Sequence, residues 1–260
     1  MRVEKYLLRI IEREGAAHLS LIDPAKQVPE VAGRMASSAA EGGSDGIMVG
    51  GSTGVSGKLL DETVLAIKES VDLPVILFPS SELSISGHAD AIFFMSMLNS
   101  SDPYYITGAQ RLGAPRVREL GLEAIPMAYL VVEPGGAAGR VGKANLIPRD
   151  KPELAASYAL AAQYLGMRFV YLEAGSGAEE PVPVEMVRTV RRAVDATLLV
   201  GGGIRTPKVA AERVEAGADI VVTGTVVERS GDKAGRIRRI VEAIKSRRGA
   251  RGVAWSSRRC

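Results

Sequence analysis

Cysteine and histidine are almost absent from this 260-residue sequence, which holds one cysteine, Cys260, and two histidines, His18 and His88. One cysteine cannot form an intrachain disulfide bond, so a disulfide framework is excluded. The usual structural zinc sites need four cysteines, or two cysteines with two histidines, and are excluded as well. Both histidines are interpreted as structural, because one lies inside an apolar run and the other in a connector.

Strong charge, long apolar runs and a secretion signal are also lacking. The formal net charge is +3, which is too small to indicate a nucleic-acid partner. No run reaches the roughly 18 apolar residues of a transmembrane helix. The first residues mix charges and lead into an amphipathic stretch rather than a signal peptide. A cytoplasmic protein is therefore expected. From Lys245 onward every charged residue is basic, which indicates a solvated tail or, alternatively, one attracted to a membrane surface.

Short runs rich in valine, isoleucine and leucine recur along the chain. Continuous runs of this kind are typical of parallel strands that are buried on both faces. Eight strands are the number in a closed (β/α)8 barrel, which takes about 250 residues as one domain. The runs are His18–Ile22, Gly46–Val49, Pro74–Phe78, Ala91–Met95, Ala124–Val132, Phe169–Leu172, Thr197–Val200 and Asp219–Thr223.

Helical patterns lie between most of these runs, as expected for a parallel sheet with helices outside it. Pro79–Asp90 breaks the alternation, because it is short for a parallel crossover and rich in poor helix formers. We therefore predict an α/β fold, a TIM barrel over residues 1–245 whose third helix is replaced by an extended connector, with a basic tail over residues 246–260. The predicted helices are Val28–Ala40, Gly57–Val71, Pro152–Leu165, Pro183–Val194 and one that begins at Pro207 with Thr206 as its N-cap.

Glycine-rich turns follow the last two predicted strands, at Gly201–Gly203 and at Thr223–Thr225. Consecutive glycines let backbone N–H groups approach an anion closely. The loops after strands seven and eight are also the usual phosphate site of this fold. The alternative is that the glycines only form tight turns. The paired arrangement favours a phosphate site without indicating which phosphate binds.

Carboxylates at strand ends are candidates for chemistry, because the active sites of barrels form there. Glu173 ends strand six and is a candidate general base whose pKa burial would raise. Alternatively, it caps the next helix or pairs with an arginine. Asp23 ends strand one and Ser52 follows strand two; such a pair suits Mg²⁺, which takes few protein ligands and bridges substrate phosphates. Asp23 is equally well explained as a turn residue before Pro24.

Two further segments have two interpretations each. Met97–Tyr105, after strand four, either borders a groove for a long apolar ligand or belongs to the ordinary core. The loop Glu133–Arg149 is long for its place in a barrel, and long loops often bind ligands. Its three cations either clamp an anion or lie on an exposed surface; they are Arg140, Lys143 and Arg149.

These segments together resemble the geranylgeranylglyceryl phosphate synthase family, the prenyltransferases that make the first ether bond of archaeal lipids. The resemblance covers about residues 5–245. Tyr171–Gly177 discriminates best, since triple glycines occur in many phosphate-binding barrels. The family also lacks the third barrel helix. The other segments that carry the resemblance are Ser20–Pro24, Val49–Val55, Leu98–Ser100, Gly201–Ile204 and Thr223–Thr225.

The resemblance implies a set of site residues. Mg²⁺ is expected at Asp23 and Ser52, and Glu173 is expected to act as the base on the glycerol hydroxyl. Some members have a lysine where this chain has Leu21, and this departure favours the branch that forms larger homo-oligomers. The sn-glycerol 1-phosphate is expected to bind at Tyr171, Leu172, Glu173, Ala174, Gly175, Ser176, Gly177, Gly202, Gly203, Gly224 and Thr225.

The resemblance also implies the reaction. The C3 hydroxyl of sn-glycerol 1-phosphate attacks geranylgeranyl diphosphate, an ether bond forms and diphosphate leaves. The prenyl chain is expected near Ala91–Leu98 and Tyr104–Tyr105. Three alternatives stay open: a different prenyl length, as in bacterial heptaprenylglyceryl phosphate synthase; a sugar-phosphate or indole-pathway isomerase; and a phosphate-binding module without catalysis.

Overall fold

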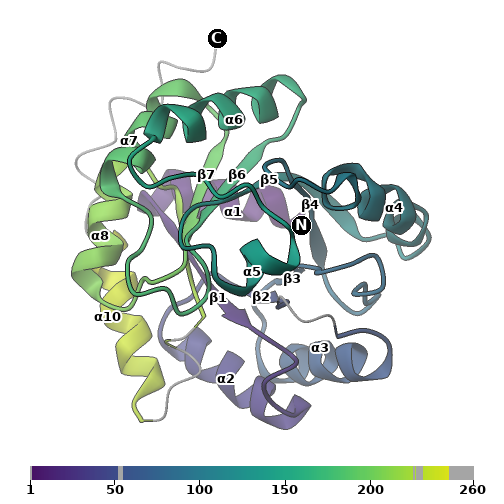
Figure 1. Cartoon of the computed structure of the whole chain (residues 1–260). Coiled ribbons are helices and arrows are strands. Elements are labelled where there is room, and N and C mark those ends of the chain that lie inside the picture. The colour runs from purple at the N-terminus through teal and green to yellow at the C-terminus, as the bar shows by residue number, and fades with distance from the viewer. Residues whose placement is uncertain (1, 52–54, 225, 227–230, 246–260) are drawn as a thin grey trace.

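The fold is a closed barrel of eight parallel strands that pair in the order β1 to β8, with β8 returning to β1 (Figure 1). The computed structural model describes residues 2–51, 55–224, 226 and 231–245. The predicted TIM barrel and its eight strands are confirmed. The strands are β1 (Ala17–Ile22), β2 (Gly46–Val49), β3 (Val75–Leu77), β4 (Ala91–Met97), β5 (Glu123–Val131), β6 (Phe169–Glu173), β7 (Thr197–Gly201) and β8 (Ile220–Thr223).

Helices surround the strands (Figure 1). Five of them confirm the predicted helices: α2 (Pro29–Glu41), α3 (Lys58–Ser70), α6 (Pro152–Tyr164), α7 (Val184–Ala193) and α8 (Pro207–Ala216). At the start of α8 the Thr206 hydroxyl accepts a hydrogen bond from the Val209 N–H, as its sequence indicates. The amphipathic N-terminal stretch forms α1 (Val3–Glu14). The segments that the sequence did not predict are η1 (Tyr104–Gly108), α4 (Ala109–Glu119), α5 (Gly136–Val141) and α10 (Lys233–Lys245).

Residues 78–90, between β3 and β4, contain no helix, which confirms the predicted extended connector. The two strands still pair in parallel, with Ile76 opposite Ala91. Asp90 ends the connector, where its carboxylate accepts a hydrogen bond of 2.8 Å from the Val75 N–H and pairs with Lys68 of α3 at 2.7 Å. One short, well-anchored segment therefore replaces a helix on this side of the barrel.

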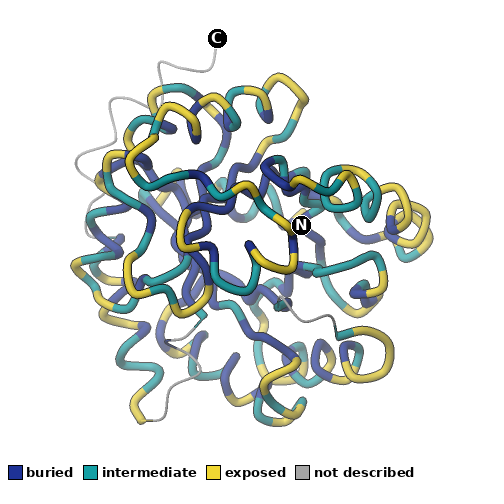
Figure 2. Tube along the Cα trace, in the orientation of Figure 1, coloured by how far each residue is buried: buried dark blue, intermediate teal, exposed yellow. Residues whose placement is uncertain are grey.

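Helix α1 closes the amino end of the barrel. Its N-terminus is held by Glu123, the first residue of β5, whose carboxylate accepts hydrogen bonds from the N–H groups of Val3 and Glu4 at 2.5 and 3.2 Å. A carboxylate in this place also compensates the helix dipole. The apolar face of α1 packs with the residues that fill the barrel interior, in the buried centre of Figure 2. The four buried side chains of α1 are Val3, Leu7, Ile10 and Ile11.

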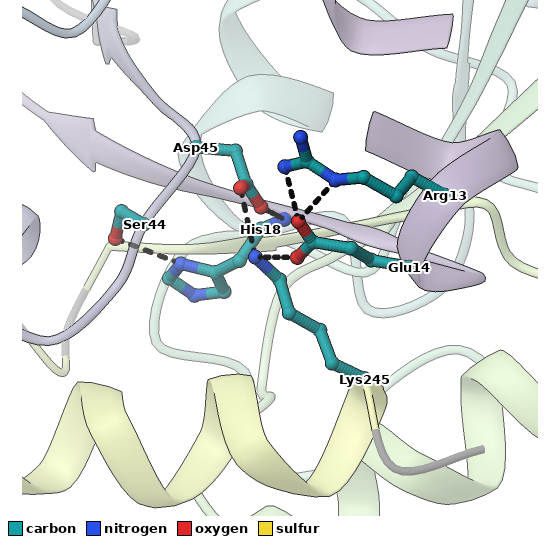
Figure 3. Close-up of polar contacts among 6 residues, drawn as sticks. All are labelled: Arg13, Glu14, His18, Ser44, Asp45 and Lys245. Atoms are coloured by element: carbon teal, nitrogen blue, oxygen red, sulfur yellow. Dashed lines mark hydrogen bonds and ion pairs between the residues drawn. The ribbon is translucent and has the colours of Figure 1, made fainter. Parts of the chain in front are cut away.

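A partly buried polar cluster ties α10 to the rest of the fold (Figure 3). Lys245, the last residue of α10, pairs with Glu14 at 2.5 Å and with Asp45 at 2.8 Å. His18 is fully buried, and its ring nitrogens lie 2.9 Å from the Ser44 hydroxyl and 3.0 Å from the Thr223 hydroxyl. His18 is thus structural, as predicted, and Lys245 belongs to the barrel rather than to the tail.

The buried imidazole of His18 makes stability depend on pH. Burial, with a smaller contribution from Lys245, lowers the pKa of His18 to about 3. In the unfolded chain a histidine has a pKa near 6.5, so acid protonates the unfolded state first. Stability that is complete above about pH 6.5 is therefore lost as the pH falls toward 3. Between pH 7 and 5 we expect the free energy of unfolding to fall by about 2 kcal/mol more in the wild type than in His18→Gln. Urea titrations measure this difference, and equal losses in both proteins would contradict it.

Candidate active site

A cavity opens at the carboxyl end of the barrel and encloses about 970 Å³, its open mouth included. Leu172 and Ala174 do not line it, because they face the outer apolar layer between strands and helices. Gly175 does not line it either, but its backbone N–H donates a hydrogen bond to the Glu173 carboxylate, which does. Ser52 and Thr225 lie outside the described residues. The predicted site residues that do line the cavity are Asp23, Tyr171, Glu173, Ser176, Gly177, Gly202, Gly203 and Gly224.

Glu173 is the buried carboxylate of this cavity. It ends β6 and is only 6% exposed. The Gly175 N–H donates a hydrogen bond of 2.7 Å to its Oε1 atom. Gly202 approaches from β7 with a φ of +78°, and a side chain at that position would collide with the carboxylate. The N-terminus of α7 has no side-chain cap, so the alternative in which Glu173 caps this helix is wrong.

The surroundings of Glu173 raise the affinity of its carboxylate for a proton. Burial raises the pKa of Glu173 and outweighs the hydrogen bonds from the Tyr171 hydroxyl and the Gly175 N–H, which lower it. The Tyr171 ring packs against Tyr129 and Phe78, with ring centroids 5.3 and 5.6 Å apart. Burial, and next the charge of Glu173, raise the pKa of both tyrosines, which therefore stay protonated. A carboxylate with a raised pKa is a better match for proton transfer near neutral pH.

Four glycines after β6 and β7 have positive φ, with values of 106°, 76°, 78° and 72° at Gly175, Gly177, Gly202 and Gly203. They do form tight turns, and the turns also face the cavity. Successive N–H groups in such turns make concave sites that bind anions. The guanidinium of Arg205 holds the two loops together, because it donates hydrogen bonds of 2.6 Å to the Gly177 carbonyl and 3.5 Å to the Glu179 carbonyl.

Asp23 follows β1 and is buried, with 9% exposure. Its Oδ1 atom accepts a hydrogen bond of 3.0 Å from the Ala25 N–H, so it has the turn role that the sequence allowed. The carboxylate also lies against Gly51, where a side chain would collide with it. Among the described residues, no group of three or more histidines, cysteines, aspartates or glutamates is arranged so that it could hold a metal ion. A single carboxylate is nevertheless a ligand that Mg²⁺ accepts, since the ion takes few protein ligands and keeps several waters.

The long loop after β5 contributes apolar atoms to the cavity rather than charge. It contains α5, whose Ala138 and Val141 line the cavity. Lys143 pairs with Asp102 at 2.8 Å, and Arg149 pairs with Glu180 at 3.1 Å. None of the three cations of this loop lines the cavity. The interpretation of these cations as an anion clamp is therefore not supported. Arg140 and Lys143 are exposed and Arg149 is half-buried, which favours the alternative of a charged surface.

An apolar groove of about 510 Å³ continues from the cavity between the connector and α4. Met97 and Tyr105 belong to both hollows, so the interpretation of this segment as a groove is favoured over the ordinary core. Across the groove, the Tyr104 hydroxyl donates a hydrogen bond to Glu82 of the connector. The apolar residues that line only the groove include Ile85, Ile92, Phe93, Phe94 and Ala109.

Comparison with known proteins assigns the chain to a family. The PcrB family matches residues 8–244. The chain belongs to the PcrB family. It is 60% identical over 243 residues to a geranylgeranylglyceryl phosphate synthase of Methanothrix thermoacetophila, covering 93% of this chain and 95% of that protein. It is 56% identical to the enzyme of that name from Methanosarcina acetivorans, over 95% of this chain and 100% of the relative. The resemblance seen in the sequence is confirmed.

Solved structures agree with this assignment. The (S)-3-O-geranylgeranylglyceryl phosphate synthase of Thermoplasma acidophilum, crystallised with its substrate sn-glycerol 1-phosphate, superposes with a TM-score of 0.92 at 50% identity. The match covers 95% of this chain and 99% of that one. A thiamine phosphate pyrophosphorylase from Pyrococcus furiosus has a TM-score of 0.57 at 14% identity, which reflects a shared fold alone.

The structure of this PcrB-family protein adds cavity residues that sequence patterns did not single out. Phe78, Ser80 and Tyr129 line the cavity, as does Lys26 near its mouth. Tyr129 had a detectable signal: in β5 it shares the inward face with Met127 and Val131, two residues away on either side. Lys26 had no such signal, because a lysine four residues after the end of a strand is ordinarily exposed.

Proposed function

We propose that this protein transfers the geranylgeranyl group of geranylgeranyl diphosphate to the C3 hydroxyl of sn-glycerol 1-phosphate, in archaeal membrane lipid biosynthesis. The named relatives, at 55–60% identity, support this reaction. The observation that carries the proposal is the position of Glu173. Its buried carboxylate lies in the cavity between glycine-rich turns suited to a phosphate and an apolar groove suited to a prenyl chain.

The acceptor is held by its phosphate. The turns at Ser176–Gly177 and Gly202–Gly203, with Gly224 after β8, would offer backbone N–H groups to the anion. A substrate fixed at its phosphate has a limited set of positions for its free hydroxyl. Because Glu173 lies within the same wall of the cavity, the hydroxyl is brought to the base rather than meeting it by diffusion.

The donor places its apolar chain in the groove and its diphosphate in the cavity. As the allylic C–O bond breaks, the electron pair leaves with the diphosphate and positive charge develops on the allylic carbon. The acceptor oxygen forms the new ether bond to that carbon. Its proton passes to Glu173, whose carboxylate is kept ready by burial and by the Gly175 N–H.

We further propose that the enzyme depends on Mg²⁺. Asp23 is the described residue that would hold the ion, with Ser52 as the second ligand. When bound, Mg²⁺ supplies positive charge that makes diphosphate a better leaving group. The buried position of the Asp23 carboxylate against Gly51, inside the same cavity as Glu173, supports this role.

Incubation with labelled sn-glycerol 1-phosphate and prenyl diphosphates of several lengths tests the function. With Mg²⁺ we expect a lipid-soluble labelled product, formed fastest from the geranylgeranyl donor. EDTA is expected to abolish the product and added Mg²⁺ to restore it. A preference for longer donors would favour a heptaprenyl specificity. Absence of lipid-soluble label with every donor would refute the transferase, and full activity in EDTA would refute the metal requirement.

Two expectations from the sequence stay predictions. They are the homo-oligomer and the cytoplasmic location, with or without contact to a membrane surface. Among the helices that the structure describes, none combines the length and apolar character needed to cross a bilayer. The basic tail over residues 246–260 lies outside the described part of the chain.

A further inference from the structure

The described lining of the cavity has more negative than positive side chains, although the proposed reaction brings two phosphorylated substrates there. Of the described residues that line it, three carry charge: Asp23, Glu173 and Lys26. Two of these are carboxylates, which repel a diphosphate. Backbone N–H groups of the glycine turns serve the acceptor phosphate on the other side. Lys26 is therefore the one cationic side chain that the described cavity offers to the donor.

Other cations of this region lie outside the cavity. Lys143 pairs with Asp102, and Arg149 pairs with Glu180 and donates to the Pro181 carbonyl at 3.0 Å. Arg205 donates to loop carbonyls of the glycine turns. None of these three side chains lines the cavity. Lys26 does line it, with 45% of its side chain exposed at the mouth and its Nζ atom 3.9 Å from Asp23 Oδ2.

The barrel order places Lys26 correctly for the donor. Lys26 follows β1, which pairs with β8 on one side and β2 on the other. The glycine turns of the acceptor site follow β6 and β7, and the apolar groove runs beside β4 and the connector after β3. The groove and the cavity share Met97 and Tyr105, so a prenyl chain in the groove would leave its diphosphate in the cavity that Lys26 and Glu173 line.

We propose that Lys26 binds the diphosphate of the allylic donor and stabilises it as the allylic C–O bond breaks. This role rests on the prenyl transfer proposed above. The bond that forms is the ether bond, the acceptor proton goes to Glu173, and the departing diphosphate keeps the electron pair next to the Lys26 ammonium. An ammonium is a compact point charge with three donors, which suits the several oxygens of a leaving diphosphate.

Inorganic pyrophosphate, the leaving group itself, is the probe that tests Lys26 without turnover. By calorimetry in the presence of Mg²⁺, we expect Lys26→Met to weaken pyrophosphate binding by about 10- to 100-fold, as for the loss of a charge-assisted hydrogen bond. Lys26→Arg, which keeps the charge, should restore most of the affinity. The dissociation constant for sn-glycerol 1-phosphate should stay at the wild-type value in both variants.

Lys143→Met is the matched control, because it removes a cation of the same region that does not line the cavity. In steady-state assays Lys26→Met should raise KM for the prenyl donor, with KM for the acceptor unchanged, and Lys143→Met should change neither. Unchanged pyrophosphate binding in Lys26→Met, or a larger loss in Lys143→Met, would overturn the proposal. A wild-type protein that binds pyrophosphate through Lys26 but forms no ether product would instead refute the transferase reaction.

Discussion

Glu173→Gln is expected to lower kcat by about 10²- to 10⁴-fold, the usual contribution of a general base. The glutamine amide cannot accept the proton of the acceptor hydroxyl. It still fills the same volume and accepts the hydrogen bond that the Gly175 N–H donates to Glu173. The phosphate contacts lie on other residues, so calorimetry should show acceptor binding close to that of the wild type. Near-normal turnover in this variant would show that Glu173 is not the base.

Glu173→Gln should also be more stable than the wild type at neutral pH, because burial of the charged Glu173 carboxylate lowers the free energy of unfolding. Burial raises the pKa of Glu173 above its ordinary value of 4.5, so above that pH the unfolded chain accommodates the charge better than the folded one. The carboxylate therefore lowers stability at neutral pH, and this penalty disappears as the pH falls below about 4.5. We expect a higher Tm for Glu173→Gln at pH 7 and nearly equal Tm values near pH 4. A Tm at pH 7 that is lower in the variant would contradict this account.

The pH profile of the wild type follows from the same shift. Glu173 serves as a base only when ionised, so kcat should fall as the pH drops through its pKa. Because that pKa is raised, the acidic limb should lie above the pH at which an exposed glutamate titrates.

Gly202→Ala is expected to disrupt both stability and catalysis. The residue has a φ of +78°, which costs an alanine roughly 1 kcal/mol. A Cβ atom there would also lie 2.7 Å from the Gly175 N atom and 2.8 Å from its O atom, and it would collide with the Glu173 carboxylate. Neither backbone can move without opening the turns that face the cavity. We expect a loss of about 2–4 kcal/mol in the free energy of unfolding and a fall in kcat of more than about tenfold.

Gly166→Ala separates backbone strain from this collision. Gly166 has a comparable φ of +84°, but no atom lies within 4 Å of an added Cβ. It follows α6, away from the cavity. Its replacement should therefore cost only about 1 kcal/mol and leave kcat unchanged. Chemical denaturation and steady-state kinetics on the two variants measure the difference. Equal losses of stability and of kcat in both would mean that the close approach of Gly202 to Glu173 contributes to neither.

Much of the site follows from local features of the sequence. A strand that is buried on both faces needs a continuous apolar run, so the eight strands and their ends could be recognised. Strand ends in a barrel converge on one face, so Glu173, Asp23 and the glycine turns could be expected to lie together. The connector could be recognised too, because Pro79–Asp90 has neither the length nor the residues of a crossover helix. By contrast, α4 gave little helical signal, since it carries Gly113 and Pro115 in its interior.

The tertiary structure decided which residues, distant in sequence, become hydrogen-bond or ion-pair partners. Glu123 holds the start of α1 from 120 residues away, and Lys245 joins the end of α10 to Asp45 across 200 residues. The pairing of Lys143 with Asp102, which removes it from the set of anion-binding candidates, is of the same kind. So is the placement of Lys26 in the cavity. Periodicity and spacing report which face a residue occupies, because they depend on the geometry of one strand or helix. Partners and charge balance depend on how separate elements pack, and only the folded barrel determines them.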